Sequence, residues 1–307
     1  MRIIERFCRG KHADQSLNED GLVVTEDFAA VVDGVTGKSL RHLWRPSGGV
    51  VAKDLLASAI AVLPREASMR EVQRVLDGRL RDEYARFAAV HGDVSSCDVS
   101  SGDVSSRVFE VEPWERLQAN AVVYSVFRRE VWLFGDCQVM VDGVRTPTLK
   151  RVDELLGELR SFAARALALR ADAEMRCSDG PETVATDGSA RSSHVDGSGD
   201  PARDMIMPFL RLQSEFANRR GEYGYFVFDG FTDPEYPIRV VPVEPGAEVV
   251  LASDGYPLLR STLAGSEAEL GRLRREDPGL VREFRSTKGF TAGLESFDDR
   301  TYLRFIA

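Results

Sequence analysis

Acidic residues stand at turns beside apolar, strand-like runs at several points along this chain of 307 residues. Strand ends place side chains at the rim of a sheet, where segments distant in sequence can meet. If these carboxylates meet, their repulsion and desolvation call for protons or cations as compensation. The segments are Asn18-Glu19-Asp20-Gly21, Val31-Val32-Asp33-Gly34, Leu251-Ala252-Ser253-Asp254-Gly255, Phe297-Asp298-Asp299-Arg300-Thr301 and, as a weaker case, Gly135-Asp136.

Hard divalent cations are the natural compensation for such a cluster, because Mg²⁺ and Mn²⁺ prefer carboxylate, carbonyl and water oxygens. Any single Asp-Gly pair is typical of an ordinary turn. The ordered set at strand ends favours a metal site instead. Such a site would leave all four histidines, His12, His42, His91 and His194, without a catalytic role.

Charge and composition argue against several classes of protein. The net charge of −9 does not favour binding to nucleic acid or to an anionic membrane. The N-terminal residues lack the apolar run of a signal peptide, and no uncharged apolar stretch is long enough to span a bilayer. The four cysteines show no CxxC spacing, which favours reduced thiols. We therefore expect a cytoplasmic protein.

The pattern of apolar residues predicts strands and helices in an irregular order. That order is not a βαβ alternation, and it favours an α+β fold with mostly antiparallel pairing. The predicted strands are 2–8, 21–25, 28–32, 119–127, 130–134, 137–141, 224–228, 238–243, 248–252 and 301–306, and the predicted helices are 49–63, 68–90, 150–175, 205–219, 256–260 and 267–275.

We expect one domain over residues 1–307, because neither half alone contains all the acidic turns. Three tandem five-residue units of the Gly-Asp-Val-Ser-Ser type predict a low-complexity loop at 91–107. The Gly-, Ser-, Asp- and Thr-rich stretch 178–203 is predicted to be disordered.

The ordered motifs NED, DGVTG, GDC, LASDG and DDRT resemble those of the metal-dependent protein phosphatases of the 2C type, the PPM family. The resemblance runs from Glu19 to Thr301. It implies a two-sheet antiparallel β sandwich flanked by helices, in α-β-β-α layers, with metal ions at one end. In that family the insertion at about 150–219 corresponds to a variable flap that faces the substrate.

The resemblance also implies roles for particular residues. Asp33 would bridge two metal ions, and the Gly34 carbonyl would bind the second. Asp254 and Asp298 would complete the first site. The second ion would be held by Glu19 through water, with Asp20 orienting the shell, and Asp136 would serve a possible third ion.

The implied activity is the hydrolysis of phosphoserine and phosphothreonine monoesters by a water that bridges two divalent ions. The cofactors would be Mn²⁺ or Mg²⁺, two per chain and possibly a third. The partner would be a phosphorylated protein or a small phosphorylated metabolite.

Some positions depart from the family pattern. Gln15 stands where many members have an arginine that grips the substrate phosphate, and Val35 stands where some have a histidine. Thr36 replaces a glycine, and Cys137-Gln138 replaces Ser-Arg. Candidates to grip the phosphate in place of Gln15 are Arg9, Lys11, His12 and Lys38.

Two other readings of the sequence are a regulator, which the departure at Gln15 favours, and a nucleotide-binding protein. A divergent relative could bind metal or a phosphorylated ligand and regulate a partner without catalysis. A nucleotide-binding loop is suggested by Gly34-Val-Thr-Gly37-Lys38-Ser39, but a P-loop needs glycine where Val32 stands, so we set this reading aside.

Overall fold

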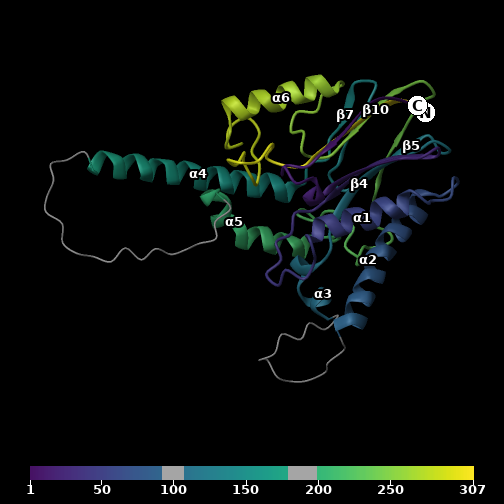
Figure 1. Ribbon diagram of the computed structural model, residues 1–307, viewed down its shortest axis with the longest axis horizontal. Helices are drawn as coiled ribbons and strands as arrows, with labels where there is room; N and C mark the ends of the chain where they lie inside the picture. The colour runs from purple at the N-terminus through teal and green to yellow at the C-terminus, as the bar shows by residue number, and fades with distance from the viewer. Residues whose placement is uncertain (92–106, 179–198) are drawn as a thin grey trace.

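Two five-stranded antiparallel sheets form the centre of the protein in the computed structural model, which describes residues 1–91, 107–178 and 199–307 (Figure 1). The first sheet has the order β1 (Arg2–Arg9), β10 (Arg300–Ile306), β9 (Glu248–Ala252), β6 (Gln138–Val141) and β7 (Val144–Thr146). The second has the order β2 (Asp20–Val24), β3 (Phe28–Gly34), β4 (Ala119–Ser125), β5 (Glu130–Phe134) and β8 (Arg239–Pro242). These sheets confirm the expected α+β fold.

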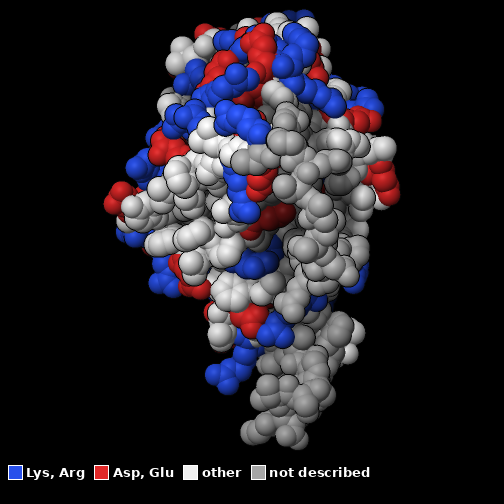
Figure 2. Space-filling model, turned by 90° about the vertical axis from the view of Figure 1, so that its left-hand side faces the viewer, with Lys and Arg blue, Asp and Glu red and all other residues white. Residues whose placement is uncertain are grey.

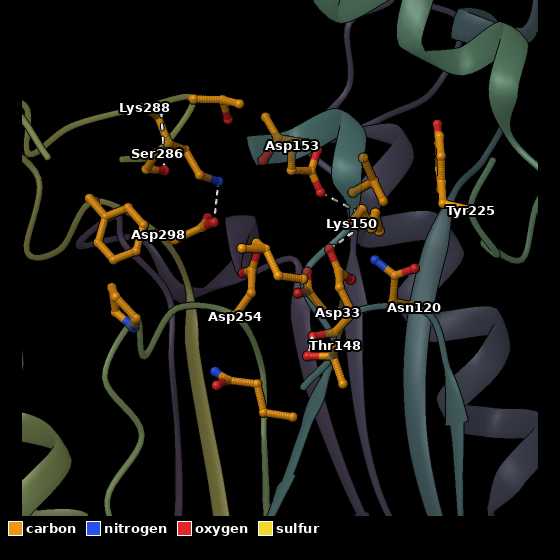
Figure 3. Close-up of a pocket in the computed structure, with 18 of the residues that line it drawn as sticks. Asp33, Asn120, Thr148, Lys150, Asp153, Tyr225, Asp254, Ser286, Lys288 and Asp298 are labelled. Carbon is orange, nitrogen blue, oxygen red and sulfur yellow. Dashed lines mark hydrogen bonds and ion pairs between the residues drawn. The ribbon is translucent and has the colours of Figure 1, made fainter. Parts of the chain in front are cut away.

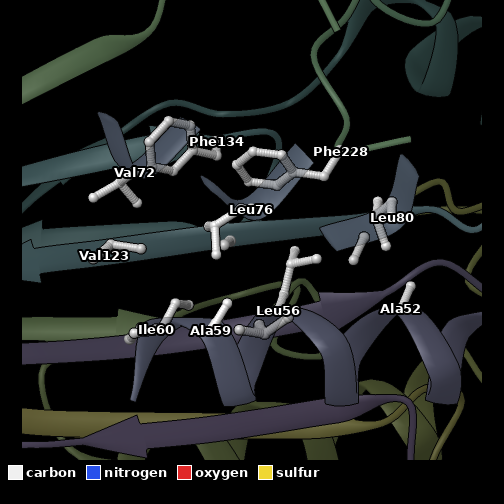
Figure 4. Close-up of a cluster of buried hydrophobic side chains, with 14 of the residues drawn as sticks. Ala52, Leu56, Ala59, Ile60, Val72, Leu76, Leu80, Val123, Phe134 and Phe228 are labelled. Carbon is white, nitrogen blue, oxygen red and sulfur yellow. The ribbon is translucent and has the colours of Figure 1, made fainter. Parts of the chain in front are cut away.

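Alternation of side chains along the strands divides the core into layers. In β3, Ala29 and Val31 point toward the first sheet and meet Leu251 and Phe305. The opposite face of β3 packs against α1 (Gly48–Ile60) and α2 (Met69–His91), where Leu56 and Leu76 lie in the same apolar cluster (Figure 4). On the outer face of the first sheet, Tyr302 packs with Tyr256 and Leu259.

The remaining helices lie beside the sandwich (Figure 1). They are α3 (Val108–Val111), α4 (Arg151–Ser178), α5 (Pro201–Leu212) and α6 (Leu263–Glu276), with 3₁₀ turns at Gln15–Leu17, Pro113–Glu115 and Gln213–Phe216. The sandwich brings the two ends of the chain together, because β1 pairs with β10. No helix in the described ranges is long and apolar enough to cross a membrane.

Several local predictions are wrong. Residues 224–228 form no strand, because their backbone makes only isolated bridges to Ala119 and Ala217 and bonds to the side chain of Asn218. Residues 256–260 form no helix; Gln138 holds the carbonyls of Ser253 and Tyr256 in a turn.

One boundary within residues 150–219 also differs from the prediction. Helix α5 begins at Pro201, inside the stretch predicted to be disordered, because Asp200 caps it by accepting a hydrogen bond from the Arg203 amide. Residues 92–106 and 179–198, which hold the predicted low-complexity loop and most of the predicted disordered stretch, lie outside the described residues.

Truncation of one core side chain should test the packing of α2 on the second sheet. Leu76 is fully buried between α2 and the sheet, so Leu76→Ala should lower the free energy of unfolding by about 2–5 kcal/mol. The neighbouring Val75 is 42% exposed, and Val75→Ala should cost less than about 1 kcal/mol. Urea unfolding of both variants measures the difference, and equal losses would contradict this packing.

Candidate metal centre

The strand ends bring the predicted acidic residues to one end of the two sheets. Asp33 is the penultimate residue of β3 and pairs with Asp20 at the start of β2. Asp136 lies between β5 and β6, Asp254 follows β9, and Asp298 precedes β10. Five segments from across the chain thus place carboxylates around one site.

Asp33, Asp136, Asp254 and Asp298 line one cavity of about 180 Å³. Basic side chains line the same cavity, and they are Lys38, Arg145, Lys150, Arg203, Arg285 and Lys288. Figure 2 shows acidic side chains deep in a hollow of this face, with basic side chains next to them. The site therefore offers an acidic floor and a basic surround.

Asp33 and Asp254 stand at the middle of the cavity, between an ion pair on each side (Figure 3). Within the described residues, neither carboxylate makes a hydrogen bond or an ion pair. Desolvation, followed by the negative charge of Asp254, Asp20 and Asp136, raises the pKa of Asp33 well above its usual range. Desolvation and the nearby Asp298 and Asp136 raise the pKa of Asp254, which opens onto the cavity, to about 7.

Two more carboxylates have an oxygen without a hydrogen-bond partner among the described residues. Asp20 is buried, and its Oδ2 receives no hydrogen bond. Burial raises the pKa of Asp20 well above its usual range, although a hydrogen bond with Ser253 opposes the shift. The Oδ1 of Asp136 is likewise unpartnered, while its Oδ2 lies 2.7 Å from Lys150 Nζ. These oxygens add to the unpaired acidic side of the site.

Lysines neutralise the opposite side. Asp298 pairs with Lys288 and lies 3.3 Å from Lys11 Nζ. Burial alone would raise the pKa of Asp298, but the two ammonium groups outweigh it and lower that pKa to about 2. Asp298 is thus ionised and already paired.

Glu19 is positioned by the start of α1. Ser47 is the N-cap of this helix: its hydroxyl accepts a hydrogen bond from the Val50 amide and donates one of 2.7 Å to Glu19 Oε1. Gly34 lies so close to the start of α1 that a Cβ added to it would lie 2.1 Å from the Gly49 carbonyl oxygen. Glycine is therefore required where β3 meets α1.

The candidates for gripping phosphate lie in different surroundings. Lys38 lines the cavity and makes no hydrogen bond or ion pair through its ammonium in the described part of the chain. Burial, and then the positive charge of Arg203, lower the pKa of Lys38 to about 8. Arg9 pairs with Glu295 outside the cavity, and the Lys11 ammonium faces carboxylates.

The residues that depart from the family pattern have defined places in the structure. Gln15 closes its own turn, because its side chain accepts a hydrogen bond from the Gly10 amide and donates one to the His12 carbonyl. Val35 lines the cavity. Thr36 donates a 2.6 Å hydrogen bond to Glu19 Oε2.

Asn120, Arg203 and Lys288 are among the cavity side chains that sequence reasoning missed. Asn120 lies opposite Asp33 in the β3–β4 pair, and its buried Oδ1 has no hydrogen-bond partner in the part of the chain that the structure describes. Gly135, at φ 104°, leaves room for Asn120, since a Cβ there would lie 2.1 Å from Oδ1. Arg203 reaches the cavity from α5, and Lys288 from the loop after α6. Strand pairing brings Asn120 to the cavity, α5 brings Arg203, and the loop between α6 and β10 brings Lys288.

The oxygen donors fit Mg²⁺ or Mn²⁺ on the unpaired side. Asp33, Asp254 and the free oxygens of Asp20 and Asp136 supply the hard ligands that these ions prefer. Among residues 1–91, 107–178 and 199–307, no three His, Cys, Asp or Glu side chains are yet close enough to share one ion. A bound cation would therefore draw the carboxylates together.

Among known proteins, the chain aligns with solved structures only. No protein-family model matches the chain, and no curated protein matches its sequence. The catalytic domain of the serine/threonine phosphatase PstP, solved with two manganese ions, aligns over 99% of this chain and 98% of its own, at 15% identity and a TM-score of 0.39. MsPP from Mycobacterium smegmatis, a PPM Ser-Thr phosphatase solved with cacodylate, aligns over 100% and 99%, again at 15% identity and a TM-score of 0.39.

RsbX in complex with magnesium aligns over 98% of this chain and 94% of its own, at 10% identity and a TM-score of 0.38. The family that the sequence motifs resemble is thus represented among the structures that align with the chain. Because these identities and TM-scores are low, the chemistry of the site is inferred from its own residues and not from these structures.

The raised pKa values predict that the metal-free protein loses stability as the pH rises from 6 to 8. The pKa of Asp254 is about 7 in the folded state and 3.8 ordinarily, so unfolding releases a proton below pH 7. The free energy of unfolding therefore falls as the pH rises through 7. Lys38, with a pKa of about 8, acts in the opposite sense only above pH 8.

Melting temperatures in EDTA at pH 6 and pH 8 measure this effect, which we expect to be a few degrees. Asp254→Asn should reduce the difference, because it removes the titrating group. A melting temperature that rises between pH 6 and pH 8 would contradict the unpaired arrangement of Asp254.

Proposed function

We propose that the protein is a divalent-metal-dependent phosphatase that hydrolyses phosphoserine and phosphothreonine monoesters. The observation that carries this proposal is the division of one cavity into unpaired carboxylates and surrounding cations. Asp33 and Asp254 offer the place for a cation, while Lys38 and Arg203 line the same cavity with positive charge. A phosphate monoester is the ligand class that needs both.

The chain's own residues would divide the work in the following way. Asp33, Asp254 and the free oxygen of Asp136 would hold Mg²⁺ or Mn²⁺, with Asp20 behind them. When bound, a divalent cation acidifies water and offsets the charge on phosphoryl oxygens. Lys38 and Arg203 would bind and orient the phosphate, the role that the sequence left open at Gln15.

Hydrolysis of p-nitrophenyl phosphate by the purified protein tests the proposal. We expect turnover with Mn²⁺ or Mg²⁺ and none with EDTA. A phosphothreonine peptide assayed beside small phosphorylated metabolites then identifies the substrate class. Turnover that persists unchanged in EDTA would refute a metal-dependent reaction.

A second candidate is a protein that binds metal or a phosphorylated ligand and regulates a partner without hydrolysis. Gln15, whose side chain hydrogen-bonds to Gly10 and His12 of its own turn, favours it, because the arginine expected there is missing. Calorimetric Mn²⁺ binding without turnover on any phosphate ester would support this second candidate.

The role of Lys38 predicts a split between binding and turnover. Lys38→Met should raise KM for p-nitrophenyl phosphate about 10- to 100-fold, because a charge-assisted hydrogen bond to phosphate contributes roughly 1.5–3 kcal/mol, and should change kcat less. Lys53→Met is the matched control, since Lys53 pairs with Asp54 on α1 and does not line the cavity. Equal KM values for the two variants would exclude Lys38 as the phosphate-binding group.

A further inference from the structure

The carboxylates at this end of the sandwich fall into two groups according to what faces them. Both oxygens of Glu19 are occupied: Oε1 accepts from Ser47 at 2.7 Å, and Oε2 accepts from Thr36 at 2.6 Å and from Lys11 Nζ at 3.1 Å. Asp33 and Asp254, in contrast, have no hydrogen-bond or ion-pair partner within the described residues. Within the described residues, only the first group is in direct contact with a cationic side chain.

Lys11 is the centre of the neutralised group. Its Nζ lies 3.1 Å from Glu19, 3.3 Å from Asp298 and 3.0 Å from Asp299, and it donates to the Thr36 hydroxyl at 3.2 Å. The residue is only 8% exposed, and its backbone amide donates to Asp299 Oδ1 at 2.7 Å. A cation surrounded by four oxygens from three segments of the chain is the arrangement that a bound metal ion would have.

The position of Lys11 leaves no room for a second cation beside Glu19. A divalent ion there would stand within a few ångströms of the ammonium, and at about 4 Å two like charges repel by roughly 4 kcal/mol per unit charge product even at an effective dielectric of 20. Displacing Lys11 would instead leave its ammonium buried and unpaired. Thr36, which replaces a glycine of the family pattern, gives Lys11 an additional oxygen.

We propose that the Lys11 ammonium permanently replaces one divalent cation, so that the protein binds a single metal ion, on the Asp33–Asp254 side. Glu19 then anchors Lys11 rather than holding an ion through water. This inference rests on the proposed metal-dependent function and lowers the number of ions from the two implied by the sequence. Asp136 keeps one free oxygen for the single ion, because Lys150 takes only the other.

Metal stoichiometry of the full-length wild-type protein is the first test. Metal-stripped protein is titrated with Mn²⁺, and bound ions are counted by native mass spectrometry and by isothermal calorimetry. We expect one ion per chain. Two ions would overturn the replacement by Lys11 and leave the proposed function standing, whereas no bound ion would overturn both.

Lys11→Met provides the second test, because it removes the charge and keeps the length of the side chain. We expect the melting temperature in EDTA to fall, since three carboxylates lose their counter-ion, and Mn²⁺ to restore it as the count rises from one ion to two. A folded Lys11→Met variant that still binds one ion would overturn the proposal. If this variant does not fold, the wild-type stoichiometry decides.

Lys288→Met is the matched control. Lys288 also pairs with Asp298, but in the described chain it contacts no other carboxylate, so its removal opens no multi-oxygen site. We expect one ion in this variant. A rise to two ions in Lys288→Met as well would show that loss of any lysine charge adds an ion, and would contradict a specific role for Lys11.

Discussion

Asp33→Asn should abolish metal-dependent hydrolysis of p-nitrophenyl phosphate, by at least about a thousandfold, while leaving the protein folded. Asp33 is surrounded by other acids, since Asp254, Asp20, Asp136 and Asp298 all raise its pKa. Asparagine keeps the shape of the side chain but removes one of the negative charges that would hold the cation. Mn²⁺ affinity should therefore fall together with turnover.

The same substitution should have the opposite effect on the stability of the metal-free protein. An unpaired carboxylate among like charges destabilises the fold, so its neutralisation should leave the melting temperature in EDTA unchanged or raise it by a few degrees. Thermal scanning with and without Mn²⁺ separates the two effects. The stabilisation by Mn²⁺ seen in the wild type should be largely lost in the variant.

Asp54→Asn is the control for Asp33→Asn. Asp54 is an exposed α1 carboxylate that pairs with Lys53 and lies outside the cavity. We expect normal turnover and normal Mn²⁺ stabilisation. If Asp33→Asn hydrolyses phosphate esters at the wild-type rate, the place assigned to the cation is wrong.

The acidic side of the site could be predicted from the sequence because its signals are local. Each of Asp33, Asp136 and Asp254 follows an apolar run that forms a strand, and the rim of a sheet is where strand ends gather. Antiparallel pairing of β2 with β3 then brings Asp20 next to Asp33. A pattern read over five residues was enough to find them.

The basic side could not be predicted in this way, because it depends on contacts between distant parts of the chain. Lys11 meets Asp298 and Asp299 across more than 280 positions, and Lys288 reaches Asp298 from a loop without a motif. The sequence suggested Lys11 as a phosphate ligand, whereas its ammonium lies among carboxylates. Neutralisation of charge is a property of the folded site.

The errors in secondary structure have a similar origin. Phe226 and Phe228 have the apolar alternation of a strand, but their segment is held by single bridges and by the Asn218 side chain instead of a ladder. Conversely, β7 was missed although Asp142-Gly143, both at positive φ, forms the turn of a two-residue hairpin between β6 and β7. That turn was readable from the sequence.

Gly34→Ala should disrupt the site from the backbone. A Cβ at this position would lie 2.1 Å from the Gly49 carbonyl oxygen and 2.8 Å from the Glu19 carbonyl oxygen, both of which are backbone atoms. The Gly34 amide also donates to that Glu19 carbonyl at 2.8 Å, so the clash falls on the contact that fixes Glu19. We expect a loss of about 3 kcal/mol or more in the free energy of unfolding.

Gly37→Ala separates this effect from a general intolerance of the loop to alanine. No atom lies within 4 Å of a Cβ built at Gly37, three residues further along. The free energy of unfolding of Gly37→Ala should stay within about 0.5 kcal/mol of the wild type.

Because β3 and α1 position Asp33 and Glu19 from opposite sides of Gly34, any Gly34→Ala protein that folds should also bind Mn²⁺ more weakly. Wild-type stability of Gly34→Ala in urea would show that β3 and α1 do not meet as closely as described.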